Sequence, residues 1–366
     1  MIINDRRQKQ AALAYVISKG WFPQIELIIQ PPRSANRKPY EITDIDVYGA
    51  APDELSGYRS IVFDCKGGRQ ASAVTRAMWL KGLMTYLDAE WGICVLADQK
   101  MIPSDHREAA GELGVSLMTL SEFDVFAQAT DGSSEMPISH LANIDHWGTY
   151  IKIGEKYPQL QAAVDFSRGK YWALASGGDA VRHSITLLRQ LRGELDPAKR
   201  EHLVAFGDVL ALFLFGLAKV GHRLFRAYLQ PASRNELDAV LLPYMYGGRE
   251  SYSLVEQLTL LIERRPRLHG QAEIAFPEWD SFLQLTRSLL DAPMQALAAP
   301  LLAREVAWSF FESSPGFEFA QMLARSKRQT GKFCLQAAKY LGTAAKLPPE
   351  FADQFSRIFL MIQVPD

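Results

Sequence analysis

Two short stretches decide the fold of the first half of this chain: EITDIDVYG (residues 41–49) and RSIVFDCKGG (residues 59–68). The first alternates apolar and polar residues, and the second has a continuous apolar run; both patterns are typical of β-strands. A loop with Gly, Pro and Asp separates them, and Gly67-Gly68 ends the second. The sequence therefore predicts two successive strands.

Four chemically active side chains lie on these two strands. Residues two apart in a strand share a face, so Asp44 and Asp46 point to the same side of the first strand. The same spacing brings Asp64 and Lys66 together on the second strand. Carboxylates inside an apolar strand are costly unless they are paired or bind a cation. We therefore expect a divalent metal site here.

The residue types suit Mg²⁺ and phosphodiester hydrolysis. Mg²⁺ prefers oxygen ligands, keeps several waters and takes one or two protein carboxylates, which Asp46 and Asp64 would supply. The backbone carbonyl of Cys65 offers a further oxygen. Lys66 would hold the attacking water or hydroxide and offset the charge that develops on phosphorus, while the metal lowers the pKa of the water.

The flanking sequence predicts an α/β domain with a mixed sheet flanked by helices. Apolar periodicity and Gly or Pro breaks give the order α-β-β-β-α-β-α-β. Besides the two strands, the expected elements are a helix at 8–19, a strand at 25–29, a helix at 70–89, a strand at 92–97, a helix at 104–113 and a strand at 115–120.

This arrangement resembles the PD-(D/E)xK superfamily of restriction-endonuclease-like nucleases, especially its Mrr-like and Holliday-resolvase-like branches, over residues 8–126. Asp46 matches the first acid of the motif, Asp64 the second and Lys66 the lysine, and Cys65 fills the variable position. The resemblance implies a nuclease, more narrowly an endonuclease, that depends on Mg²⁺ or Mn²⁺, and it suggests bacterial restriction or antiviral defence.

The chain departs from the superfamily pattern on the first helix. Many relatives place a glutamate there, and the nearby residues here are Gln8, Lys9 and Gln10. Gln10 could bind a metal-bound water, or Asp44 or Glu41 could substitute for the missing acid. The sequence leaves this open.

Polar residues after the lysine are candidates for contact with nucleic acid. Arg69, Gln70 and Arg76 lie at the start of the next helix, where relatives in the superfamily approach the phosphate backbone. Such contacts would position DNA rather than read its bases.

The second half of the chain reads as mainly α-helical. Residues 129–143 have the polar, Gly- and Ser-containing composition of a linker, so we expect a nuclease-like domain at 1–128 and a helical domain at 144–366. The helical domain would serve partner binding, homodimerisation or regulation. Its expected helices are at 178–193, 197–228, 234–246, 252–264, 278–291, 293–312, 317–326 and 331–341.

Composition excludes several function classes. The formal net charge of −1 gives no global attraction to nucleic acid or to an anionic membrane. The apolar run at 209–220 is shorter than the roughly 20 residues of a membrane span, so we expect a buried helix and no membrane partner. Three widely spaced cysteines favour a reducing cytoplasm, and the histidines show no spacing that indicates zinc.

Two functions remain. The first is a cytoplasmic, metal-dependent nuclease acting on DNA. The alternative is a catalytically silent nuclease fold that binds nucleic acid or acts as a scaffold in a larger complex, which the missing glutamate of the first helix favours and the retained Asp46, Asp64 and Lys66 oppose.

Overall fold

The computed structural model divides the chain into two compact units, each built from two segments. We call them the sheet unit, Met1–Ala173 with Arg304–Leu323, and the helical unit, Leu174–Ala303 with Ala324–Asp366. The structure describes residues 3–31, 40–68, 72–99, 101–130, 136–231, 233–263 and 276–363.

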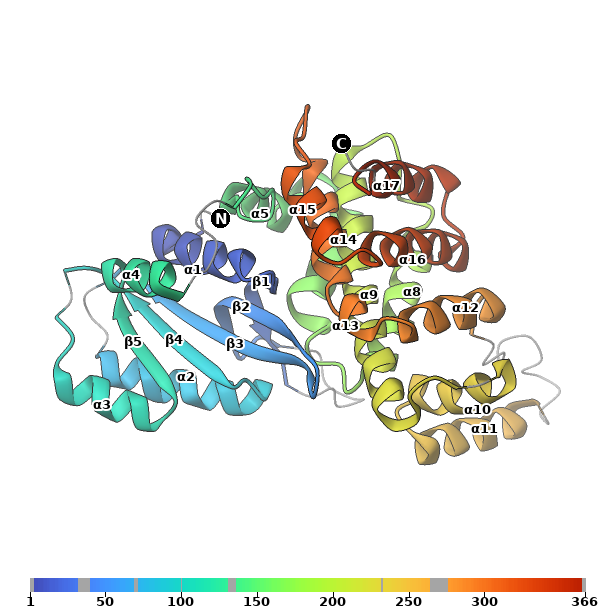
Figure 1. The fold of residues 1–366 in the computed structure, drawn as a ribbon, viewed down its shortest axis with the longest axis horizontal. Coiled ribbons are helices and arrows are strands. Elements are labelled where there is room, and N and C mark those ends of the chain that lie inside the picture. Colours follow the sequence, from blue (N-terminus) through green and yellow to red (C-terminus); the bar gives the residue numbers. More distant parts are fainter. Residues whose placement is uncertain are drawn as a thin grey trace. The chain divides into compact units, whose positions relative to one another are not determined.

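The sheet unit contains a five-stranded mixed sheet in the order β1-β2-β3-β4-β5 (Figure 1). Strand β2 pairs antiparallel with both β1 and β3, whereas β3, β4 and β5 are parallel to one another. The mixed sheet predicted from the sequence is therefore present. Its strands are β1 (Phe22–Ile29), β2 (Thr43–Asp53), β3 (Gly57–Lys66), β4 (Trp91–Leu96) and β5 (Val115–Thr119).

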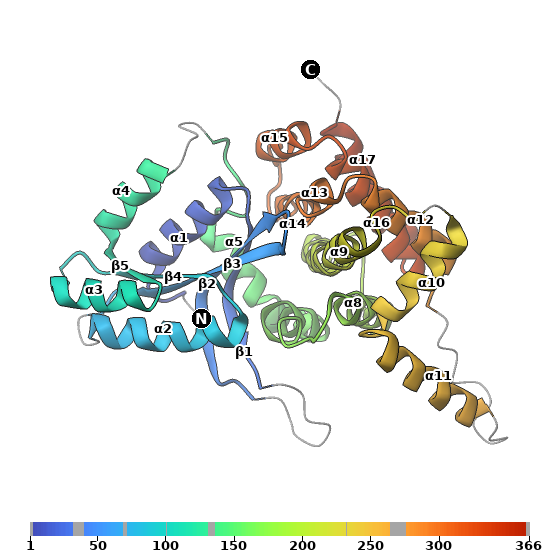
Figure 2. The same cartoon turned by 60° about the horizontal axis from the view of Figure 1, so that its bottom comes forward.

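Helices cover both faces of this sheet: α1 and α4 lie on one face, and α2 and α3 lie on the other (Figure 2). On the first face the rings of Tyr15, Phe63 and Phe123 pack edge to face, with centroids 5.6–6.3 Å apart. This aromatic cluster joins α1, β3 and α4, although α4 was not expected from the sequence. The four helices are α1 (Arg6–Ser18), α2 (Ala73–Leu87), α3 (Ser104–Glu112) and α4 (Leu120–Thr130).

The sheet unit continues well beyond the linker expected at residues 129–143. Arg304 is fully buried, and its guanidinium donates to the carbonyl oxygen of Pro23 at 2.5 Å and lies 4.3 Å from the centroid of the Phe22 ring. This contact fixes the segment after residue 303 on β1. The further elements of this part are α5 (Ile144–Ile151), α6 (Ile153–Lys156), η1 (Pro158–Leu160), α7 (Gln161–Asp165) and the π-helical turn η2 (Phe166–Lys170).

The helical unit is mostly helical, as its periodicity predicted. The expected helix at 293–312 is divided into α13 and α14, and Pro300, which has no N–H to donate, lies in the first turn of α14. Helix α17 was not expected. The helices are α8 (Gly177–Leu191), α9 (Arg200–Tyr228), α10 (Arg234–Met245), α11 (Arg249–Glu263), α12 (Trp279–Leu290), α13 (Pro293–Ala296), α14 (Ala299–Ser309, shared with the sheet unit from Arg304), α15 (Glu318–Ser326, shared with the sheet unit up to Leu323), α16 (Thr330–Ala345) and α17 (Pro349–Met361).

Helix α9 contains the apolar run noted in the sequence. Among the helices of the described residues, it alone has the length and apolar composition of a membrane span. However, 94% of its most apolar 18-residue stretch is buried inside the protein. Such burial is consistent with the core helix of a soluble protein.

Candidate active site

The sheet opens between β2 and β3 at the point where the predicted acids lie. Within residues 43–66 the pairing of these two strands ends at Val47 and Phe63. Beyond that pair each strand keeps only its outer neighbour, β1 for β2 and β4 for β3. Asp46 and Asp64 are the next residues on the two strands, so they lie where the backbones diverge.

Asp46 is buried and accepts three polar contacts. Its Oδ2 accepts a hydrogen bond from the backbone N–H of Cys65 at 2.7 Å, an amide that β2 no longer pairs with. The same oxygen lies 3.3 Å from Nζ of Lys66, and Oδ1 lies 2.8 Å from Nζ of Lys9. Two lysines from different elements therefore meet on this carboxylate.

Asp64 forms a two-point ion pair with Arg76 of α2. Nε of Arg76 donates to Oδ2 at 2.6 Å, and Nη2 donates to Oδ1. The Arg76 guanidinium also lies 4.2 Å from the centroid of the Trp79 ring. Burial raises the pKa of Asp64, and the positive charges of Arg76 and Lys66 offset that effect only in part.

Lys66 joins the two acids. Its Nζ is 3.3 Å from Asp46 Oδ2 and 3.7 Å from Asp64 Oδ1, and 34% of its side chain is exposed. Burial disfavours the charged ammonium, but the carboxylates of Asp46 and Asp64 outweigh burial and raise the pKa of Lys66. Lys66 is therefore a fixed cation rather than a base at neutral pH.

A second ion pair, which the sequence did not lead us to expect, completes the site. Nζ of Lys9 is 2.5 Å from Oε1 of Glu26 on β1, and the Lys9 side chain is only 3% exposed. Glu26 has a φ of 51°, in the left-handed region that non-glycine residues rarely adopt within a strand. Its backbone carbonyl accepts from Nε of Arg168 at 3.1 Å. Such local strain persists only where the surrounding structure fixes it.

A cleft of about 290 Å³ with an excess of acids is lined by five of these residues, Lys9, Glu26, Asp46, Lys66 and Arg168. A divalent cation would be attracted to such a cleft more strongly than a bare phosphate would be. Its charged lining residues are Asp5, Glu26, Glu41, Asp44 and Asp46 against Lys9, Lys66 and Arg168.

The residues fit a hard divalent cation, but through a different set of ligands from the one predicted. Carboxylate oxygens of Glu26, Asp44 and Asp46 all lie within 4.8 Å of one another. Both oxygens of Asp64 are held by Arg76, and the contact of Cys65 with the site is its N–H donating to Asp46. Asp44, weighed as a substitute acid from the sequence, belongs to this group.

Two residues with predicted roles have other partners in the structure. Gln10 lies on α1, but its side chain donates to the carbonyl of Ala142 at 2.6 Å and accepts from the N–H of Ile144, so it does not face the acids. Arg76 pairs with Asp64 instead of standing free for a phosphate. Arg69 and Gln70, the other predicted nucleic-acid contacts, lie outside the described residues.

One signal could have revealed Glu26 in advance. It stands in the apolar strand FPQIELII, so the cost of burying a carboxylate, which singled out Asp64, applies to it equally. No comparable sequence signal identifies Lys9 or Arg168, because each joins the site through contacts with residues that are distant in the sequence.

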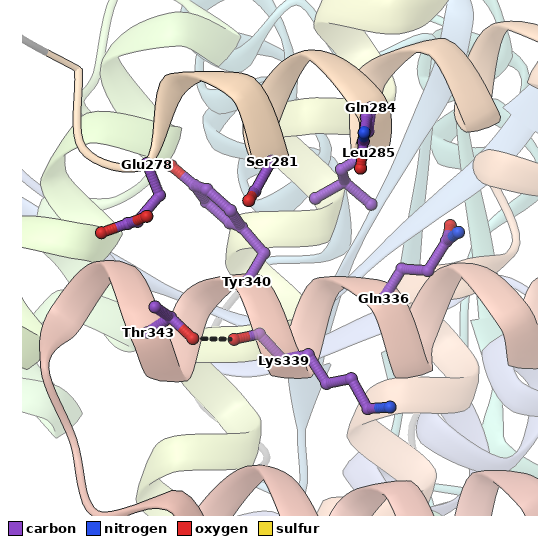
Figure 3. Close-up of a pocket in the computed structure, with 8 residues that line it drawn as sticks. All are labelled: Glu278, Ser281, Gln284, Leu285, Gln336, Lys339, Tyr340 and Thr343. Atoms are coloured by element: carbon purple, nitrogen blue, oxygen red, sulfur yellow. Dashed lines mark hydrogen bonds between the residues drawn. The ribbon is translucent and has the colours of Figure 1, made fainter.

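The helical unit contains a pocket of about 230 Å³ between α12 and α16, and it offers no comparable group of acids (Figure 3). Tyr340 extends from α16, and its hydroxyl donates to the carbonyl of Pro277 at 2.8 Å. Thr343 donates to the backbone carbonyl of Lys339. Glu278 is the single carboxylate among its described lining residues, so this pocket has no cluster of acids that could hold a metal.

Comparisons of the chain with protein-family models, with curated proteins and with solved structures find no match.

Proposed function

We propose that the sheet unit is a metal-dependent nuclease that hydrolyses phosphodiester bonds in DNA. The observation that carries the proposal is the convergence of Asp46 and Asp64 on Nζ of Lys66, at 3.3 and 3.7 Å, where β2 and β3 diverge. A scaffold has no physical reason to keep two buried acids and a half-buried lysine together beside an acidic cleft.

The carboxylates of Glu26, Asp44 and Asp46 would hold Mg²⁺ or Mn²⁺. When bound, the metal supplies a water of lowered pKa and neutralises charge on the phosphate. Lys66, kept protonated by its two acids, orients the attacking oxygen and stabilises the negative charge that builds up on the phosphoryl group. Asp46 positions Lys66 directly, and the pair of Asp64 with Arg76 fixes the strand beneath it.

The resemblance of the motif extends this proposal to endonuclease activity, to the cytoplasm and to a restriction or antiviral defence setting. The helical unit would then bind a protein partner, form a homodimer or regulate cleavage.

A second function has one specific observation in its favour. The ammonium of Lys9 lies 2.5 Å from Glu26 and 2.8 Å from Asp46, between two carboxylates that a metal would otherwise bridge. A lysine in this position neutralises the acids without a metal. The protein would then be a catalytically silent nuclease fold that binds nucleic acid or acts as a scaffold.

Cleavage assays test the first function directly. The full chain would be incubated with plasmid, linear single-stranded DNA and RNA, with Mg²⁺, with Mn²⁺ and with chelator. We expect metal-dependent cleavage of DNA by the wild type and none by Asp46→Asn. Cleavage that persists in Asp46→Asn would point to a contaminant, and folded wild type that cleaves no substrate under any condition would favour the silent fold.

Metal binding separates the two functions without an activity readout. We expect Mg²⁺ to raise the melting temperature of the wild type, because at 100 times the dissociation constant a ligand of the folded state adds about 2.7 kcal/mol to its stability. Asp46→Asn should lose this shift. Asp124→Asn, at an exposed site on α4, serves as the control and should keep it. An equal shift in all three proteins would place the metal elsewhere.

A further inference from the structure

A cluster of two histidines and a glutamate lies in the sheet unit and is made of residues other than those of the acidic cleft. His140 and His146 flank the start of α5, and Glu312 follows α14. Nδ1 of His140 is 3.2 Å from Oε1 of Glu312, and Nε2 of His146 is 3.7 Å from the same oxygen. One ligand atom from each of the three residues lies within 4.8 Å of those of the other two.

The remaining ring nitrogen of each histidine is bound to a backbone carbonyl. Nε2 of His140 is 2.7 Å from the carbonyl oxygen of Gly316, and Nδ1 of His146 is 3.0 Å from that of His140. A carbonyl oxygen only accepts, so both of these nitrogens must carry the proton. In the neutral rings the lone pairs of His140 Nδ1 and His146 Nε2 therefore face the Glu312 carboxylate.

Lone pairs and a carboxylate that face one another repel unless a metal cation lies among them or a ring takes up a second proton. This arrangement, in which each histidine donates its other N–H to a carbonyl, is the one that protein metal sites use to fix the ring and its tautomer. The side chains of His140 and His146 are only 7% and 12% exposed, so water screens the repulsion poorly.

The backbone around His140 is also held in place by a buried carboxylate. Glu305 is 1% exposed, and it accepts from Ser139 Oγ at 2.6 Å and from the N–H groups of His140 and Leu141 at 2.8 and 3.2 Å. Residues 139–141 are thus fixed on α14 before any ion binds. The cluster is preorganised on the same helix that leads to Glu312.

We propose that His140, His146 and Glu312 form a Zn²⁺ site. Two imidazole nitrogens and one carboxylate oxygen are a ligand set that Zn²⁺ takes in proteins, with a fourth position filled by water or by a substrate. The ion would link the segment before α5 to the segment after α14, which are distant in sequence but belong to the same unit. Glu312 is 41% exposed, so the fourth position faces solvent.

The test is a zinc titration of the chelator-treated full chain, with excess Mg²⁺ present to occupy the acidic cleft. We expect about one tightly bound Zn²⁺ per chain. His146→Gln and Glu312→Gln should each weaken binding at least about 100-fold, since the loss of a residue that only hydrogen-bonds to a metal ligand already costs about 10- to 100-fold. His106→Gln, on α3 in the same unit, is the matched control and should bind as the wild type does.

The opposite results would overturn the site. Folded wild type that binds no Zn²⁺ would mean that a protonated His140 simply pairs with Glu312. Unchanged affinity in both variants would place the zinc elsewhere.

A second measurement on the wild type does not depend on the variants folding. Co²⁺ in place of Zn²⁺ should give the intense visible absorption of a four- or five-coordinate site with nitrogen ligands. A spectrum that shows no more than the weak bands of six-coordinate Co²⁺ with oxygen ligands would contradict the proposal.

Discussion

Lys66→Met is expected to lower the rate of DNA hydrolysis by at least about 100-fold, the usual effect of removing one group that stabilises transition-state charge. The fold should be almost unaffected, because both acids that contact Lys66 also have other hydrogen-bond donors. Asp46 retains Lys9 and the N–H of Cys65, and Asp64 retains Arg76. With a third of the lysine side chain already exposed, we expect a stability change within about 1 kcal/mol.

The measurement is single-turnover cleavage of plasmid DNA beside thermal unfolding of the same samples. Lys81→Met, on α2, is the matched control and should cleave at the wild-type rate. Lys66→Arg tests whether charge alone is enough. A Lys66→Met variant that cleaves normally would remove the lysine from the mechanism, and one that unfolds would make it a structural residue.

The parts of the fold that depend on local pattern were predictable. Each strand of the sheet and the helices α1, α2 and α3 coincide with an expected segment to within a few residues, because apolar periodicity and glycine breaks lie in the segments themselves. The pairing of β2 with β3 also followed, since a short loop joins them. Helix α17 was missed, although its buried Phe351, Phe355 and Phe359 recur at helical spacing.

The division into units was not predictable from composition. A polar stretch at residues 129–143 reads as a linker, yet Ser139 and Leu141 within it are buried and bonded to Glu305. Arg304 bonds to Pro23, 281 residues away. Nothing local in either segment shows that residues 304–323 return to the first unit, because that contact exists only in the folded chain.

The candidate site shows the same limit. The spacing of Asp64 and Lys66 follows from the period of a strand, so their common face was predictable. The positively charged side chain that would pair with each acid was not predictable. Arg76 lies near the start of a helix where an exposed phosphate contact is equally reasonable, and only the position of α2 against β3 makes it the partner of Asp64.

The histidine cluster is non-local as well. Five residues separate His140 from His146, a spacing found in the histidine pairs of zinc sites, so the expectation that no histidine spacing indicates zinc overlooked this pair. Glu312, the third ligand, is far along the chain. Zinc was therefore not expected, and the distant Glu312 could not have been paired with the two histidines from the sequence. The two carbonyl acceptors that fix the rings belong to the backbone, so no residue type could mark them.

Asp64→Ala is expected to lower the free energy of unfolding by about 3–5 kcal/mol, the cost of leaving one partner of a buried ion pair alone. The motif on its own suggests the reverse, since removing a desolvated acid from an active site commonly relieves strain. The difference is Arg76, whose side chain is only 18% exposed and whose guanidinium bonds to both oxygens of a fully buried carboxylate.

A double-mutant cycle measured by urea unfolding isolates this pair. Arg76→Met should be destabilising in the same way, because it leaves the Asp64 carboxylate buried without its main partner. The double variant Asp64→Ala with Arg76→Met should lose much less than the sum of the two single losses, since neither charge then remains. Asp124→Ala, at an exposed position on α4, is the control and should change stability by no more than about 0.5 kcal/mol.

Strictly additive losses would show that the two side chains do not stabilise each other. In that case Arg76 would be free to leave Asp64 when substrate binds, and the phosphate contact expected from the sequence would become its better assignment.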